Sequence, residues 1–223
     1  MGLNTVFKMY RVVALGHEAG EIVDQLRKTD AYDDIRFVFC DTDANRLKTH
    51  GRDDDEHILL TGIAQCREAI HDDCELMAVL VTSLDEDESL KYAMEIMYEL
   101  WNYADYTYCF ATTPNGDAVK GKGGSLATAF NWITDYSIIT VLQDNSRLPE
   151  GLDRNKGMAR LLELILQHPR KGLSKDRDKS PFGVWATEKQ LYMALQAVYS
   201  NYPGLNGYYD AEVFSFHKSS HKY

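Results

Sequence analysis

The sequence alternates short apolar runs with amphipathic helical patterns for about 170 residues, and this alternation constrains the fold more than any other feature. The run at residues 76–81 has the length and composition of a strand that is buried on both faces, and residues 35–40 and 106–111 are also strand-like. Residues 89–103 carry apolar side chains at helical spacing. Strands that alternate with helices predict a parallel sheet with helices on both faces, so we expect an α/β, Rossmann-like fold.

The same periodicity gives the expected bounds of the other elements, with a turn at residues 16–20 between the first strand and the first helix. Strands are expected at residues 6–15, 35–40, 57–60, 76–81, 106–111, 138–142 and 211–216, and helices at residues 21–28, 43–48, 62–70, 89–103, 125–134, 155–167 and 187–199.

The alternation predicts one main domain over residues 1–168. Residues 169–182 are charged, lack apolar periodicity and are expected to form a linker. Residues 183–223 are too few for an ordinary independent core. We therefore expect them to form a short helix–strand remnant that packs on the first domain.

Charge and cysteine usage exclude several classes of protein. The formal net charge is −10, which argues against a binder of nucleic acid or of anionic membranes. The four cysteines lack C-x-x-C spacing and are expected to be reduced thiols. We find no signal-peptide pattern, and no apolar run approaches the roughly 18 residues of a membrane span, so we expect a cytoplasmic protein. The cysteines are Cys40, Cys66, Cys74 and Cys109.

Two loops follow the first two expected strands. The first is a turn that begins with Gly16 and ends with Gly20, and the second contains Thr42 and Asp43 in the run Asp-Thr-Asp-Ala-Asn-Arg-Leu. By itself a glycine-bounded turn either joins a strand to a helix or cradles an anion. In order and spacing the two loops resemble those of the tubulin/FtsZ family, in which a strand and a glycine run precede a second strand and Asn-Thr-Asp-Ala.

Later segments extend this resemblance along most of the chain. Residues 111–115 are similar to the family's Thr-Lys-Pro-Phe, and residues 141–148, which include Asn145, to its Pro-Asn-Asp-Arg-Leu. Residues 185–198 resemble the helix that opens the family's second domain. The resemblance implies the nucleotide-domain fold of that family and a residual site for GTP with Mg²⁺. Its residues would be Gly16, Gly20, Thr42, Asp43 and Asn145.

The segment at residues 82–89 departs from the family pattern. The family has a glycine-rich phosphate loop there, whereas this chain has no glycine and four consecutive acids, Asp85, Glu86, Asp87 and Glu88. One carboxylate about 4 Å from a phosphate costs about 1–4 kcal/mol. We therefore expect no bound nucleotide cofactor unless a divalent metal bridges the charges. Taken alone, the acids are typical of a solvated helix start, and a metal site and a contact for a basic partner are the alternatives.

The family's catalytic acids are also missing, because Asp176 and Asp178 lie at the wrong spacing and we assign no catalytic residue. No histidine has zinc spacing, so no metal site is expected either. The resemblance therefore implies a protein that has lost GTP binding and hydrolysis. We expect it to bind a protein partner or its own copies in a bacterial cytoskeletal or cell-division process.

Two alternatives remain open. The first is an active GTPase that uses the residual site with a metal near the acidic loop. The second is a P-loop-type enzyme built on residues 116–123, which follow a strand, precede a helix and include Lys122. The second is opposed by Gly123, which stands where a P-loop has a Mg²⁺-binding hydroxyl, so that a lysine-bearing surface loop is the plainer interpretation.

Overall fold

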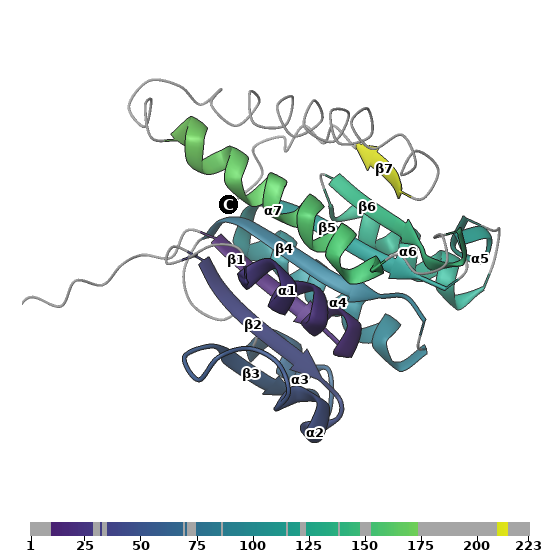
Figure 1. Cartoon of the computed structure of the whole chain (residues 1–223). Helices are drawn as coiled ribbons and strands as arrows, with labels where there is room; N and C mark the ends of the chain where they lie inside the picture. The colour runs from purple at the N-terminus through teal and green to yellow at the C-terminus, as the bar shows by residue number, and fades with distance from the viewer. Residues whose placement is uncertain are drawn as a thin grey trace, which may run out of the picture.

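A computed structural model gives the arrangement of the chain (Figure 1). The structure describes residues 10–28, 32, 35–68, 70, 75–85, 87–114, 116–120, 124–137, 139–147, 153–173 and 209–213. The expected helix at residues 187–199, the catalytic-loop candidates Asp176 and Asp178, and Cys74 lie outside these residues.

The described elements follow the predicted alternation of strands and helices. The strands are β1 (Tyr10–Leu15), β2 (Ile35–Asp41), β3 (Glu56–Leu59), β4 (Glu75–Ser83), β5 (Ala104–Thr113), β6 (Ile139–Asp144) and β7 (Tyr209–Val213). The helices are α1 (His17–Arg27), α2 (Ala44–Leu47), α3 (Ala64–Glu68), α4 (Asp87–Tyr103), α5 (Gly116–Lys120), α6 (Ser125–Asp135) and α7 (Arg154–Leu173), with a 3-10 turn, η1, at Asn145–Arg147.

In the described part of the chain, seven strands form one sheet in the order β3-β2-β1-β4-β5-β6-β7. The first six run parallel, and β7 pairs antiparallel with β6 at the edge. The predicted α/β, Rossmann-like fold with a parallel sheet is confirmed. Strands β2 and β3 lie on one side of β1, and the chain then crosses over so that β4, β5 and β6 lie on the other side. The strand order therefore reverses between β1 and β4.

Two hydrophobic layers cover the sheet, because successive residues of a strand point to opposite faces. Val12 and Ala14 of β1 pack toward α1 and α7, whereas Val13 and Leu15 pack toward α3, α4 and α6. All four side chains are buried, as expected for a central parallel strand. Figure 1 shows α1 and α7 together on one face, with α4 and α6 behind the sheet.

Several boundaries differ from the sequence-based expectation. Helix α1 begins at His17 rather than at residue 21, so that only Gly16 remains in the turn. Residues 116–120 form α5 rather than a loop. Helix α7 continues to Leu173, into the segment expected to be a linker. The domain boundaries themselves remain a prediction.

Candidate functional site at the carboxyl ends of the strands

The candidate site lies where the strand order reverses. In open α/β sheets, ligands bind outside the carboxyl ends of the strands at this switch point. Leu15 is in register with Thr82, so the turn after β1 and the loop after β4 leave the sheet side by side. The strand register therefore places the start of the acidic segment, at Asp85, near the first glycine turn.

Gly16 forms the turn that starts α1. Its φ is +87°, a conformation that L side chains adopt at a cost, and its N–H donates to the carbonyl of Cys40 at 2.8 Å. The carbonyl of Gly16 in turn accepts from the N–H of Gly20 at 3.0 Å and so begins the helix. The requirement for glycine at residue 16 thus follows from backbone geometry.

Gly20 lies inside α1 rather than in a ligand-binding loop. A Cβ atom at this position would lie 2.5 Å from Cδ2 of His50. The missing side chain therefore makes room for the imidazole ring of His50, which is only 8% exposed. This close approach gives a structural reason for Gly20 that needs no bound anion.

Thr42 and Asp43 follow β2 at the same edge of the sheet. Thr42 is exposed, and Asp43 is the N-cap of α2, where its Oδ1 accepts from the N–H of Asn45 at 2.7 Å. The N–H of Asp43 donates to Oδ1 of Asp41 at 2.8 Å, and Arg46 pairs with that same oxygen at 2.9 Å. The Asp43 carboxylate therefore serves as an ordinary helix cap in this structure.

Glu18 is the residue at this site that sequence reasoning missed. Its side chain is 12% exposed and reaches across the strand ends, although it starts on α1. Thr112 Oγ1 donates to Glu18 Oε2 at 3.1 Å, and Asn145 Nδ2 donates to Glu18 Oε1 at 3.1 Å. Arg154 Nε lies 3.4 Å from Oε1. The ends of β5 and β6 and the start of α7 thus all meet one carboxylate.

Asn145 is the one predicted site residue that contacts this carboxylate, and its own Oδ1 accepts from Gln143 Nε2 at 2.7 Å. The sequence did mark Glu18 as unusual, because it stands where the tubulin/FtsZ family has a run of glycines. Its partners could not be read from the sequence, since Thr112 and Asn145 are 94 and 127 residues away.

The loop after β4 is tied to the neighbouring strand. Leu84 is fully buried, and its N–H donates to the carbonyl of Thr112 at 2.7 Å. Asp85 is exposed, and the side chains of residues 86–88 lie outside the described part of the structure. A buried leucine and an exposed acid thus stand where the resemblance would have glycines.

The structure does not support the P-loop alternative. The first five residues of that pattern form α5, and a Cβ at Gly116 would lie 2.2 Å from Oδ2 of Asp144. A carboxylate therefore packs against the start of the segment that would have to cradle a phosphate. Residues 121–123, including Lys122, lie outside the described residues.

The described cysteines offer no reactive nucleophile. Cys40, Cys66 and Cys109 are free and buried, as expected of reduced thiols. Burial raises the pKa of Cys66 to about 12, with further contributions from Glu95 and Glu99. Burial also raises the pKa of Cys40 and of Cys109 well above that of a free thiol. Because the thiolate is the reactive form, these groups are inert at neutral pH.

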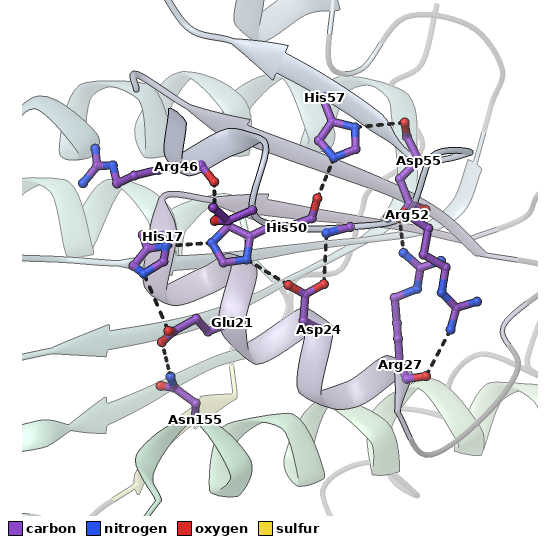
Figure 2. A network of polar contacts seen from close by, with 12 residues as sticks. His17, Glu21, Asp24, Arg27, Arg46, His50, Arg52, Asp55, His57 and Asn155 are labelled. Atoms are coloured by element: carbon purple, nitrogen blue, oxygen red, sulfur yellow. Dashed lines mark hydrogen bonds and ion pairs between the residues drawn. The ribbon is translucent and has the colours of Figure 1, made fainter. Parts of the chain in front are cut away.

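A second polar network lies on the outer face of α1 (Figure 2). His17 Nδ1 and His50 Nε2 are 2.7 Å apart, and His50 Nδ1 lies 2.8 Å from Asp24 Oδ2. Glu21 accepts a hydrogen bond from Asn155 Nδ2 at 2.6 Å. These five residues line a cavity of about 360 Å³ between α1, the start of α7 and the loop after α2.

No described helix has both the length and the apolar character needed to cross a membrane. No protein-family model and no curated protein sequence matches the chain.

Solved structures, in contrast, resemble the chain over most of its length. A C-terminally truncated TubZ of Clostridium botulinum phage c-st has a TM-score of 0.51 and 13% identity, with 86% of this chain and 75% of that chain covered. A mutant FtsZ of M. jannaschii has a TM-score of 0.55 and 15% identity, covering 78% and 59%. CetZ2 of Haloferax volcanii, solved as a GTPγS-bound protofilament, has a TM-score of 0.55 and 14% identity, covering 70% and 57%.

The chain thus spans between 57% and 75% of the length of these three structures. At such identities the likeness concerns the fold, and at that level it confirms the resemblance drawn from the loops. The chain has the fold of the nucleotide-binding domain of the tubulin/FtsZ family.

Proposed function

We propose that this protein keeps the tubulin/FtsZ nucleotide-domain scaffold but does not bind or hydrolyse GTP, and that it acts through contacts with its own copies or with a protein partner. The observation that carries the proposal is the position of Glu18. Its carboxylate lies at the carboxyl ends of the strands and already takes the hydrogen bonds of Thr112 and Asn145. Those donors would otherwise be open to a ligand.

Electrostatics supports the same conclusion. A phosphate about 4 Å from the Glu18 carboxylate would be disfavoured by about 1–4 kcal/mol, depending on the effective dielectric constant. Arg154, the cation described beside this carboxylate, is already paired with it. Asp85 adds a further exposed acid on the loop after β4. A nucleotide would have to displace Glu18 and then compete with it for the same donors.

The fold supports an assembly role by analogy with the related structures. CetZ2 was solved as a protofilament, and this chain shares its nucleotide-domain fold. We extend this to a cytoplasmic protein of a bacterial cytoskeletal or cell-division process, whose assembly does not depend on a nucleotide. Fold alone does not determine function, so this part of the proposal depends on the direct test below.

Exposed aromatic side chains offer a surface for contact with a second copy. Tyr98, Trp101 and Trp132 are each more than one-third exposed and surround Tyr136, with ring centroids 5.1–5.5 Å from it. Tyrosine and tryptophan often carry the binding energy of protein interfaces. We expect Trp132→Ala to weaken self-association in sedimentation velocity without GTP, relative to Lys91→Ala on the same face. Association that is unchanged in Trp132→Ala would contradict this assignment.

Titration of labelled GTP, with and without Mg²⁺, tests the loss of nucleotide binding. We expect no saturable binding at millimolar GTP for the unchanged chain, and a gain of affinity in Glu18→Ala. Glu21→Ala is the matched control, because it removes a carboxylate from the same helix without freeing Thr112 or Asn145. Binding by the unchanged chain that requires Mg²⁺ and disappears in Asp43→Ala would replace this proposal with an active nucleotide site.

A further inference from the structure

The outer face of α1 carries a pair of possible metal ligands one helical turn apart. His17 Nε2 and Glu21 Oε1 are 3.6 Å apart, and both side chains are about half exposed. Residues at i and i+4 share one face of a helix, so both groups face the cavity described above. Figure 2 shows the pair at one end of the polar network.

The hydrogen-bond partners of the histidines assign the tautomer of His17. The Asp24 carboxylate can only accept, so Nδ1 of His50 donates to it at 2.8 Å. In neutral His50 the other ring nitrogen, Nε2, therefore carries a lone pair. That atom lies 2.7 Å from Nδ1 of His17, which must then donate. In neutral His17 the remaining nitrogen, Nε2, also carries a lone pair, and it faces the carboxylate of Glu21.

Two acceptors that face one another are satisfied by a bridging water, a proton or a metal ion between them. A proton is poorly suited to this place, because 3.6 Å is too long for a side-chain hydrogen bond. A metal ion suits it better. Zinc lies about 2.0–2.2 Å from nitrogen and oxygen ligands, and ligand atoms 3.6 Å apart then subtend an angle of about 120° at the metal.

Both groups are held by further contacts of the kind that support metal ligands. His17 is oriented by His50, which is oriented in turn by Asp24, and Asp24 Oδ1 also accepts from the N–H of Gly51 at 3.0 Å. Glu21 is held through its second oxygen by Asn155 at 2.6 Å. Histidine ligands usually donate their other ring nitrogen, and carboxylate ligands are usually hydrogen-bonded as well.

We propose that His17 Nε2 and Glu21 Oε1 bind one divalent transition-metal ion of the zinc class, with water from the cavity in the remaining positions. Within the described residues, no three His, Cys, Asp or Glu side chains converge on one point, so the site is open rather than closed. The proposal departs from the sequence-based expectation of no metal site. A His-x-x-x-Glu pair on one helix lacks the two-part spacing by which zinc sites are recognised in sequences.

Calorimetric titration of the metal-free full-length chain with Zn²⁺ at pH 7.5 tests the site. We expect one Zn²⁺ per chain at this site, with binding at least about tenfold weaker in His17→Ala and in Glu21→Gln. His217→Ala is the matched control, because it removes an imidazole near the end of the sequence and leaves both ligands in place. Circular dichroism and urea midpoints establish that each variant is folded.

Asp24→Asn tests the supporting contacts while it keeps both ligands. We expect Zn²⁺ binding to weaken by about 10- to 100-fold, the usual loss when a group behind a ligand is changed. Co²⁺ used as the probe should show a visible absorption band that disappears in His17→Ala. The proposal is overturned if the unchanged chain takes up no Zn²⁺, or if His17→Ala and Glu21→Gln bind it as the unchanged chain does.

Discussion

Glu18 and Glu21 lie three residues apart on α1, yet their carboxylates are in opposite situations. Glu18 is 12% exposed and meets a hydroxyl, an amide and a guanidinium at the strand ends. Glu21 is 45% exposed, with one amide donor and an imidazole nitrogen that faces it. The same chemical group thus has three polar partners at one position and room for a further partner at the other. The two carboxylates differ because the fold brings more donors to Glu18 than to Glu21.

Removal of the Glu18 carboxylate should have the largest effect on stability. Glu18→Ala leaves the buried Thr112 hydroxyl and the Arg154 guanidinium without their partner, so we expect a loss of about 2–3 kcal/mol. Urea unfolding followed by circular dichroism measures it. Glu18→Gln should lose less, because the amide oxygen still accepts one hydrogen bond. Equal losses for the two variants would show that packing, rather than the hydrogen bonds, stabilises this region.

The next largest effect on stability should come from adding a side chain at Gly20, which lies between Glu18 and Glu21 on α1. The added Cβ would meet the His50 ring at 2.5 Å, so Gly20→Ala should cost about 1–3 kcal/mol in unfolding free energy. Gly16→Ala meets no atom within 4 Å but must adopt a φ of +87° with a ψ of 171°, a conformation used almost only by glycine, at a cost of about 1–3 kcal/mol. Zn²⁺ affinity should fall in Gly20→Ala and remain unchanged in Gly16→Ala.

A smaller effect is expected when one donor to Glu18 is removed. Thr112→Val keeps the shape of the side chain but leaves Glu18 Oε2 without its hydroxyl donor, so we expect a loss of about 1–2 kcal/mol. Urea midpoints again provide the measurement. Thr128→Val on α6 is the control, because its hydroxyl donates only to the exposed start of its own helix. Equal losses of unfolding free energy in Thr112→Val and Thr128→Val would show that the hydrogen bond to Glu18 adds nothing to the stability of the fold.

The smallest effect should follow loss of the Glu21 carboxylate in metal-free buffer. Glu21 is 45% exposed and accepts a hydrogen bond from Asn155, so Glu21→Ala should change the unfolding free energy by less than about 1 kcal/mol. With Zn²⁺ in excess the difference between this variant and the unchanged chain should grow, because ligand binding stabilises the folded state. If Glu21→Ala lost as much unfolding free energy in metal-free buffer as Glu18→Ala does, the two carboxylates would not differ in their contribution to stability.

The alternation of strands and helices was predictable because a buried parallel strand needs an apolar run and its covering helix needs an apolar face. The place of the acidic loop beside Gly16 was implied by the resemblance to the tubulin/FtsZ family. The role of Glu18 was not predictable, since the residues that bind it come from β5, η1 and α7. The need for glycine at residue 20 was not predictable either, because the His50 ring that packs against it is 30 residues away in the sequence.

The antiparallel strand β7 has a consequence for how the protein is made. It covers the edge of β6, with Val141 paired to Ala211, although 70 residues separate the two in the sequence. A ribosome that has synthesised the chain as far as Leu173 has completed all six parallel strands, but β6 still presents unpaired backbone groups. An open edge of this kind recruits other chains. The nascent protein therefore remains exposed to misassembly until the ribosome has translated β7, which ends at Val213.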